Sequence, residues 1–364
     1  MQTRREFIES NKPVKSHRRT IVRRAEQQSW QTMGAEIGMT QGISGRPHRF
    51  SPYYETKFGA AYLGDSRVLI SQLPKWSVDL ILTSPPFALT RKKRYGNVGT
   101  RNYVRWFLPF AREFKRVLKP KGHLVIDIGG AWKPGRPVKS LYQFKLLIAL
   151  CEEVGFHLAQ DLYWFNPAKL PGPAEWVTVK RLRLKDAVDQ IWWLVKNPFA
   201  KANNADVPRE YSDAMKELLN DPNYYKPGRT RPSGQYISNK FFKRNNGAIP
   251  PNLLEFSNTE SGGRYMKACK LFNLPVHPAR YPAGIPDFFI KLLTKEGDLI
   301  LDPFAGSNVT GATAESLRRH WLAFEILEDY VKGSMGRFFT DAVLAQKLGV
   351  EPPQNMLYPL EVAA

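Results

Sequence analysis

The sequence predicts an α/β protein built around a mostly parallel sheet whose faces are covered by helices. Short apolar runs such as 78–82 and 124–128 recur along the chain and end at prolines or glycines. Amphipathic stretches long enough for helices separate them. Strands that alternate with helices are typical of parallel sheets, because each parallel strand needs a crossover to reach its neighbour. A chain of 364 residues with 43% apolar residues can bury such a core.

The predicted elements fall into two groups, which begin at Phe58 and after Pro250. In the first group, a buried strand over 78–82 ends abruptly at a Thr-Ser-Pro-Pro sequence. A helix over 101–118 follows, with Pro109 as a point where it can kink. After the breaker 119–122 come a strand over 124–128, a helix over 140–154 and strands over 156–165 and 188–195. The second group has helices over 285–293 and 310–319 and strands over 298–301 and 321–326.

The composition changes between residues 196 and 256, where Pro, Asn, Gly, Lys and Arg become frequent. The stretch 225–247 has six basic residues, no acidic residue and several aromatic rings. Because phosphates bind Lys and Arg and bases stack on aromatic rings, this pattern predicts a nucleic-acid contact surface. The alternative is a long solvated insertion. The DNA-binding candidates are Lys226, Arg229, Arg231, Lys240, Lys243 and Arg244.

The charge balance of the whole chain favours a polyanionic partner. Lys and Arg number 54 against 33 Asp and Glu, a formal net charge of +21. Nucleic acid is the leading candidate, and an anionic membrane surface the weaker one. Residues 1–50 predict a basic, loosely ordered N-terminal arm, which either lies on DNA or stays solvated. No apolar run is long enough for a membrane span, and no secretion signal opens the chain, so the expected location is the cytoplasm. Two cysteines cannot form a disulfide framework or a structural zinc site, and no metal is expected.

Two segments that follow predicted strands carry the chemistry. The tetrad Ser84-Pro85-Pro86-Phe87 comes directly after the strand 78–82, where ligands bind in doubly wound sheets. A second loop over 301–311 is rich in small residues, which let the backbone approach a ligand closely. Ala312 stands where a P-loop needs lysine, and the dinucleotide fingerprint is absent, so a nucleoside-type cofactor without pyrophosphate is favoured. Glu325 lies nineteen residues after Gly306, a spacing suited to holding ribose hydroxyls.

The order of these motifs resembles the β-group of amino-methylating DNA methyltransferases, and most closely the PvuII-type cytosine-N4 family. The resemblance covers roughly residues 58–338. It rests on the tetrad, on the Asp-Pro-Phe-Ala-Gly-Ser-Asn-Val-Thr-Gly loop that begins at Asp302, and on segments 164–171, 231–234, 249–254 and 277–282. The resemblance implies a circularly permuted Rossmann-like methyltransferase fold with an inserted target-recognition region. The implied parts are a catalytic half (51–195), the target-recognition region (196–256), a cofactor-binding half (257–338) and a C-terminal tail (339–364).

The resemblance also implies the cofactor, the reaction and the residues that serve them. S-adenosylmethionine would lie against the loop, with Phe304 packed on it, Glu325 on its ribose and Asp65 on its adenine. Ser84 and the Pro85 carbonyl would accept the amino protons of a flipped cytosine, which Phe87 would stack upon. Asn308 replaces the second glycine of the pattern found in many relatives. The full cofactor set is Asp65, Asp302, Pro303, Phe304, Gly306, Ser307, Asn308, Thr310 and Glu325.

The sequence leaves several alternatives to cytosine-N4 methylation of double-stranded DNA. Cytosine-C5 methylation is excluded, because neither Cys151 nor Cys269 follows a proline. Adenine-N6 methylation uses the same fold, although an aspartate usually stands where Ser84 does. RNA methylation and a catalytically inactive DNA-binding protein are the remaining alternatives. The resemblance further implies a restriction–modification system in a prokaryotic cytoplasm, with a monomer or weak dimer near the nucleoid that makes no direct contact with a cognate endonuclease.

Overall fold

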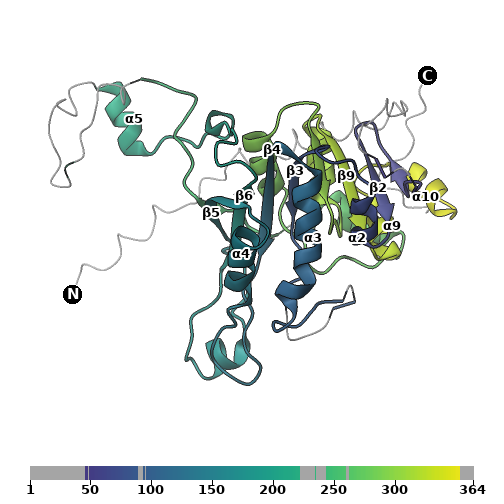
Figure 1. Ribbon diagram of the computed structural model, residues 1–364, viewed down its shortest axis with the longest axis horizontal. Coiled ribbons are helices and arrows are strands. Elements are labelled where there is room, and N and C mark those ends of the chain that lie inside the picture. The colour runs from purple at the N-terminus through teal and green to yellow at the C-terminus, as the bar shows by residue number, and fades with distance from the viewer. Residues whose placement is uncertain are drawn as a thin grey trace, which may run out of the picture. The chain divides into compact units, whose positions relative to one another are not determined.

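The computed structural model describes residues 46–47, 49–88, 93–94, 96–221, 234, 243–259 and 262–352. Within them, nine strands form one sheet (Figure 1). Most neighbouring strands are parallel, as the sequence predicts, while β1, and β6 on both sides, pair antiparallel. In spatial order the strands are β1 (Tyr54–Glu55), β2 (Gly59–Leu63), β9 (His320–Glu325), β8 (Leu299–Asp302), β3 (Val78–Thr83), β4 (Leu118–Ile128), β6 (Val188–Val195), β5 (His157–Phe165) and β7 (Leu253–Glu255).

The last two strands of the chain lie in the middle of the sheet. β8 and β9 separate β2 from β3, although β3 follows β2 in the sequence. Residues 51–195 and 257–338 therefore form one sheet together, not two separate domains. This strand order is what a circular permutation of a doubly wound sheet requires, because the cofactor-binding strands come last in the chain and central in space.

Two apolar cores cover the two faces of the sheet. On β3, Ile81 faces one core while Leu80 and Leu82 face the other, the alternation expected of a strand buried on both faces. The first core is shared by α2 (Ser66–Ser71), α3 (Tyr103–Val117) and α4 (Tyr142–Glu152), and α3 continues through Pro109. The second is shared by α6 (Arg264–Leu271), α7 (Gly284–Leu293), α8 (Val309–Ser316), α9 (Glu328–Met335) and α10 (Asp341–Leu348).

The structure differs from the sequence-based boundaries in three places. α10 lies in the segment predicted as a C-terminal tail, yet Leu344 is fully buried in the second core. Thr340 caps the helix start, and Gly349 ends it at φ +67°, which explains why a stable helix forms here. β7 lies within the segment 196–256 but adds a strand to the sheet edge beside β5. The breaker predicted at 119–122 is part of β4, whose register against β3 shifts at this point.

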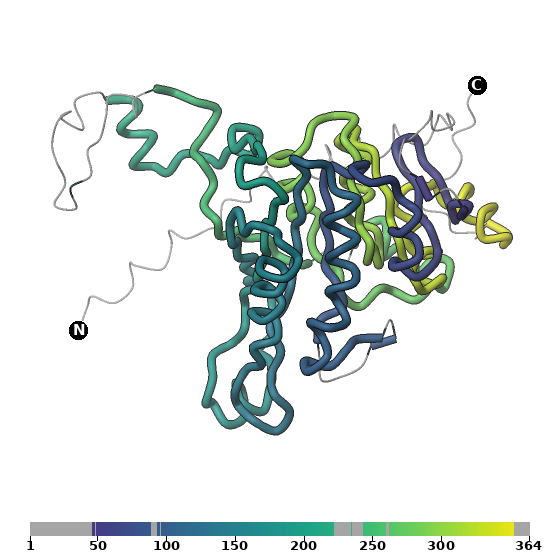
Figure 2. The backbone as a smooth tube through the Cα atoms, in the orientation of Figure 1, coloured from purple at the N-terminus to yellow at the C-terminus, as the bar shows by residue number. Residues whose placement is uncertain are grey.

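The remainder of segment 196–256 leaves the sheet at the edge where β4 begins. Val195, the last residue of β6, pairs with His123 in the middle of β4, and Lys196 donates at 2.7 Å to the carbonyl of Leu118, the first residue of β4. The chain then forms a short 3₁₀ turn η3 (Asn204–Asp206) and α5 (Asp213–Asn220). Figure 2 shows this path leading away from the sheet. The chain later returns to the sheet as β7, beside β5. In the part of the chain that the structure describes, no helix is both long and apolar enough to cross a membrane.

Candidate active site

The carboxyl ends of four neighbouring parallel strands bring the predicted site residues to one edge of the sheet. Ser84 follows β3, Asp302 ends β8, Glu325 ends β9, and Asp65 follows β2. These strands are adjacent in the order β2-β9-β8-β3, so the two motif groups meet in space although more than two hundred positions separate them. This edge is where doubly wound sheets bind their ligands.

Asp302 holds this edge together from inside. Its buried carboxylate accepts hydrogen bonds from the Thr83 hydroxyl at 2.7 Å, the Thr310 hydroxyl at 2.6 Å and the Phe304 amide at 3.1 Å. Burial raises the pKa of this carboxyl, and the hydrogen bonds oppose that change. Asp302 and Thr310 therefore shape the loop, because their side chains are already engaged with each other and with β3.

The loop after β8 depends on two left-handed backbone positions. Gly306 has φ +51°, and a Cβ there would lie 2.9 Å from the His277 Nε2 atom, so only glycine fits. Asn308 has φ +54° and caps α8 by accepting from the Gly311 amide at 3.0 Å. Asparagine is among the few residues that adopt this conformation readily, which explains how it can replace a glycine of the family pattern. Arg337 donates to the Ser307 carbonyl at 2.7 Å and holds the loop from behind.

Glu325 and Asp65 border the loop on neighbouring strands. The Glu325 carboxylate accepts from the Gly306 and Leu327 amides, each at 2.9 Å, and burial raises its pKa. Asp65 caps α2 and pairs with the Arg67 guanidinium, which lowers the pKa of Asp65. Each carboxylate oxygen can accept more than one hydrogen bond, so both groups retain capacity for a ligand.

Phe304 forms an aromatic wall beside this loop. Its ring packs edge-on against Phe110, with centroids 5.1 Å apart, and contacts Trp106 and Phe107 on α3. Pro303 fixes the preceding turn, where its carbonyl accepts from Ser66. A glycine cradle, two carboxylates and a flat apolar wall suit an adenosine-type cofactor such as S-adenosylmethionine, so the residues present fit the predicted group.

Replacing Glu325 with alanine is expected to weaken S-adenosylmethionine binding by about 1–3 kcal/mol, the usual loss for a hydrogen bond to a charged group. Titration calorimetry measures this directly. Glu328→Ala is the matched control, because Glu328 is exposed and bonds to Lys332 and Tyr53 instead. Unchanged affinity in a folded Glu325→Ala protein would remove Glu325 from the cofactor site.

The tetrad is held in place by two tyrosines and a glycine. Tyr103 donates from its hydroxyl to the Pro86 carbonyl at 2.8 Å, and Tyr142 donates to the Gly129 carbonyl. The Phe87 ring lies directly over Gly129, where an added Cβ would come within 2.5 Å of a ring carbon. Among the described residues, none donates a hydrogen bond to the Pro85 carbonyl, which leaves that oxygen available to a substrate.

Asp127 is a candidate site residue that the sequence prediction missed. It lies near the end of β4, is 3% exposed, and accepts a hydrogen bond from the Ser84 hydroxyl through Oδ2 at 3.0 Å. Its Oδ1 atom has no hydrogen-bond partner among the described residues. The available signal was a single carboxylate inside the apolar run 124–128, where an unpaired charge is costly and therefore calls for a reason.

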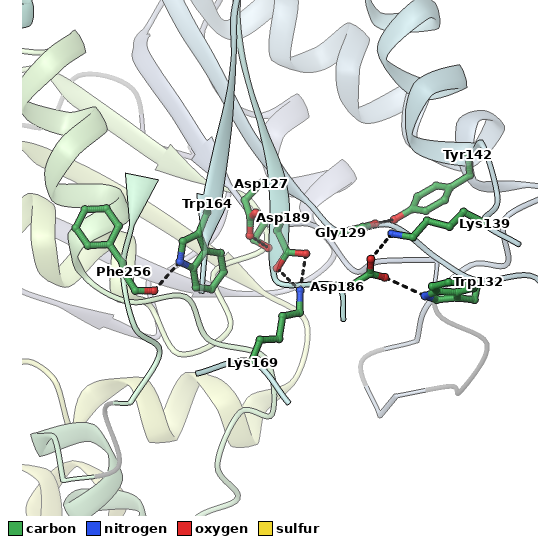
Figure 3. Close-up of polar contacts among 11 residues, drawn as sticks. Asp127, Gly129, Trp132, Lys139, Tyr142, Trp164, Lys169, Asp186, Asp189 and Phe256 are labelled. Carbon is green, nitrogen blue, oxygen red and sulfur yellow. Dashed lines mark hydrogen bonds and ion pairs between the residues drawn. The ribbon is translucent and has the colours of Figure 1, made fainter. Parts of the chain in front are cut away.

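A second carboxylate and a lysine accompany Asp127 (Figure 3). Asp189 on β6 lies two residues from Ile191, the partner of Asp127 in the sheet, so both carboxylates share one face. Lys169 contacts both Asp189 oxygens at 2.9 Å. Burial first, and the Asp189 charge second, raise the pKa of Asp127 to about 8. Such a carboxyl accepts a proton only in its ionised form, which becomes the major form as the pH rises above that value.

The structure brings the catalytic and cofactor candidates together, whereas it describes only two of the six DNA-binding candidates. Lys226, Arg229, Arg231 and Lys240 lie outside the described residues. Lys243 and Arg244 are exposed, and Arg244 donates to the Asn220 side chain at 2.7 Å, at the end of α5. Their assignment to DNA binding stays a prediction.

Comparisons with known proteins agree with the motif series. A family model of N6/N4 type, described as DNA methylase, matches residues 78–336. The curated Type II methyltransferase M.PvuII of Proteus hauseri is 48% identical over 297 residues, which cover 82% of this chain and 88% of that protein. M.ScaI of Streptomyces caespitosus, another Type II methyltransferase, is 26% identical over 293 residues, or 80% and 84% of the two chains.

A solved structure is similar over the same region. The PvuII DNA methyltransferase, described as cytosine-N4-specific, matches with a TM-score of 0.67 and 41% identity. The match covers 83% of this chain and 97% of that one.

Proposed function

Because this chain belongs to the DNA methylase family, we propose that it transfers a methyl group from S-adenosylmethionine to the N4 amino group of cytosine in duplex DNA. The single observation that carries the choice of reaction is the Ser84 hydroxyl, which heads the tetrad beside the cofactor loop and donates to the buried Asp127. The similarity to the PvuII methyltransferase, whose description names cytosine N4, supports the same choice.

We assign the preparation of the amino nitrogen to Ser84 and Pro85. A cytosine amine is a poor nucleophile because its lone pair is delocalised into the ring. Since Ser84 donates its own proton to Asp127, its oxygen lone pairs are free to accept one amino proton. The Pro85 carbonyl accepts the other. Both bonds favour a tetrahedral nitrogen whose lone pair points at the methyl group, and this positioning lowers the barrier. The cofactor supplies that methyl group on a positively charged sulfur.

Asp127 provides the destination for the proton that must leave. When the N–C bond forms and the S–C bond breaks, the amino nitrogen becomes positively charged and must lose one proton. Ser84 takes that proton while it passes its own to ionised Asp127 at 3.0 Å, so charge and atoms balance. Lys169, on the far side of Asp189, stabilises the negative charge of this carboxylate pair.

The product decides between cytosine-N4 methylation and its alternatives. DNA treated with the purified protein and cofactor is digested to nucleosides and analysed by mass spectrometry. N4-methylcytosine is the expected product, and protein with Ser84→Ala serves as the matched control. N6-methyladenine would replace the cytosine assignment and keep the fold and cofactor. The absence of any modified nucleoside would overturn the enzymatic function.

Replacing Phe87 with alanine is expected to weaken capture of the flipped base, because base–aromatic stacking contributes about 1–3 kcal/mol. The KM for DNA should rise more than kcat falls, while cofactor affinity stays the same. Phe199→Ala is the matched control, since that ring is 86% exposed near the opposite edge of the sheet. Equal effects of both changes would show that Phe87 does not contact the base.

The biological setting is proposed on the same basis. We infer action as a monomer or weak dimer in a bacterial cytoplasm, where chromosomal DNA is available. The methyl group would protect the DNA from a restriction endonuclease of matching specificity. That endonuclease would make no direct contact with this chain.

A further inference from the structure

Two loops extend from the carboxyl ends of β4 and β5 and form one unit, here called the loop pair (residues 131–140 and 167–187). Asp186 accepts a hydrogen bond from the Trp132 indole at 2.9 Å and pairs with Lys139 at 2.8 Å (Figure 3). Arg183 donates to the Pro137 carbonyl at 2.9 Å. These contacts join the two loops, which are distant in sequence, so the loop pair has a defined shape.

The loop pair is strongly basic. Eight of its residues are basic and two are acidic. Glu175 pairs with Lys180 at 2.9 Å, and Asp186 pairs with Lys139, so both acids are already engaged. Lys133, Arg136, Arg181 and Lys185 are exposed and have no acidic partner among the described residues. Such a surplus creates a positive potential that attracts a polyanion.

Exposed apolar side chains alternate with these cations. Leu184 is 89% exposed, Leu170 is 84% exposed, and Val179 is 74% exposed. Trp176 instead is buried and accepts backbone bonds from Leu182 and Arg183 through its carbonyl, which keeps the loop folded while the leucines face outward. Proteins that deform a duplex commonly place apolar side chains between base steps next to phosphate-binding cations.

The position of the loop pair relates it to the proposed chemistry. It begins just after Gly129, which lies against Phe87, and it contains Lys169, which pairs with Asp189 beside Asp127. The loop pair therefore borders the edge where a flipped base must enter. In contrast, residues 196–221 leave the sheet at the opposite ends of the strands. Lys196 marks this point, because it donates to the carbonyl of Leu118, the first residue of β4. In Figure 1 the loop pair extends below the sheet, whereas α5 stands away from the sheet at the upper left.

We propose that the loop pair holds the DNA duplex beside the flipped base, with its cations on backbone phosphates and Leu170 and Leu184 against the disturbed base stack. This rests on the proposed function, because duplex DNA is the substrate that the site would act on. It assigns DNA contact to residues outside the segment 196–256, where the sequence pattern alone places it.

The test compares two charge-matched variants. The loop-pair variant carries K133A, R136A, R181A and K185A. The control carries K75A, R112A, K121A and K145A, which remove equal charge from exposed residues outside the loop pair. Fluorescence anisotropy measures the affinity for a mixed-sequence duplex across a salt series. For the loop-pair variant, the slope of log K against log salt should fall by about 0.9 for each phosphate that the protein no longer neutralises. The control should keep the wild-type slope.

A second variant separates apolar contact from charge. The double variant Leu170→Ser, Leu184→Ser should weaken binding to a DNA fragment that the protein methylates by about tenfold, the order of magnitude expected for losing a buried leucine side chain. The slope of log K against log salt should stay unchanged. Cofactor titration and thermal unfolding confirm that each variant is folded.

The outcomes distinguish failure of the loop-pair proposal from failure of the enzyme. Equal slopes for wild type and loop-pair variant would overturn the proposal, as would equal reductions of affinity in the loop-pair and control variants. A loop-pair variant that changes only the sedimentation of the free protein would identify the loop pair as an interface between copies, which also overturns it. These binding measurements need no methyl transfer. Absence of methylated product from wild type would therefore reject the proposed function alone.

Discussion

Replacing Asp127 with asparagine is expected to lower the single-turnover rate of methyl transfer at least about 10²-fold, while cofactor affinity stays unchanged. Asparagine keeps the shape of the side chain but cannot take the proton that Ser84 passes on. Ser84→Ala should cost a similar factor, because it removes the same step. The double variant should then be little slower than either single one, since residues that act as a unit are not additive. Asp161→Asn, an exposed change on β5, is the control.

The pH dependence follows from the same carboxyl. Burial and Asp189 raise the pKa of Asp127 to about 8, so the ionised form that accepts a proton is lost as pH falls below that value. The wild-type rate should therefore increase with pH through this range. Burial also raises the pKa of Tyr142 and Tyr281, which stay neutral there and do not produce this dependence. A rate that is flat with pH, or full activity in Asp127→Asn, would show that the proton leaves by another route.

Replacing Asp302 with alanine is expected to lower the free energy of unfolding by about 3 kcal/mol or more, because several buried donors lose their acceptor at once. Thr83, Thr310 and the Phe304 amide all donate to this one carboxylate. Urea denaturation measures the change as a lower midpoint at constant slope. Asp302→Asn, which keeps one acceptor oxygen, should be destabilised less.

The control for Asp302 is Glu296→Ala. Glu296 is exposed, and its nearest cation, Arg318, is 3.8 Å away, so its removal should leave the midpoint almost unchanged. If Asp302→Ala unfolded at the wild-type urea concentration, the carboxylate would not be the hub of this edge. Its assignment to the cofactor would then have to rest on direct contact.

Local patterns in the sequence were sufficient for much of the fold and for the loops of the site. Apolar runs and breakers predicted β3, α3, β6 and β9 within a few residues, because the spacing of apolar residues along the chain shows which face an element buries. Gly306 and Glu325, nineteen residues apart in the sequence, lie side by side in the structure, where the Gly306 amide donates to the Glu325 carboxylate at 2.9 Å. This was predictable because a parallel strand, its helix and the next strand return to the same edge.

Tertiary structure alone decided what lies beside these loops. Asp127 reaches Ser84 from another strand 43 positions away, and Trp132 reaches Asp186 across 54 positions. Neither interaction has a local signature. The Asp127–Ser84 contact depends on the parallel register of β4 against β3, and the Trp132–Asp186 contact depends on the antiparallel register of β6 against β4. Residue type and local spacing thus determined the tetrad, the cofactor loop and the family. Which carboxylate receives the proton, and where the basic loop pair lies, depended on the register between strands distant in sequence, because side chains face one another only once the sheet is assembled.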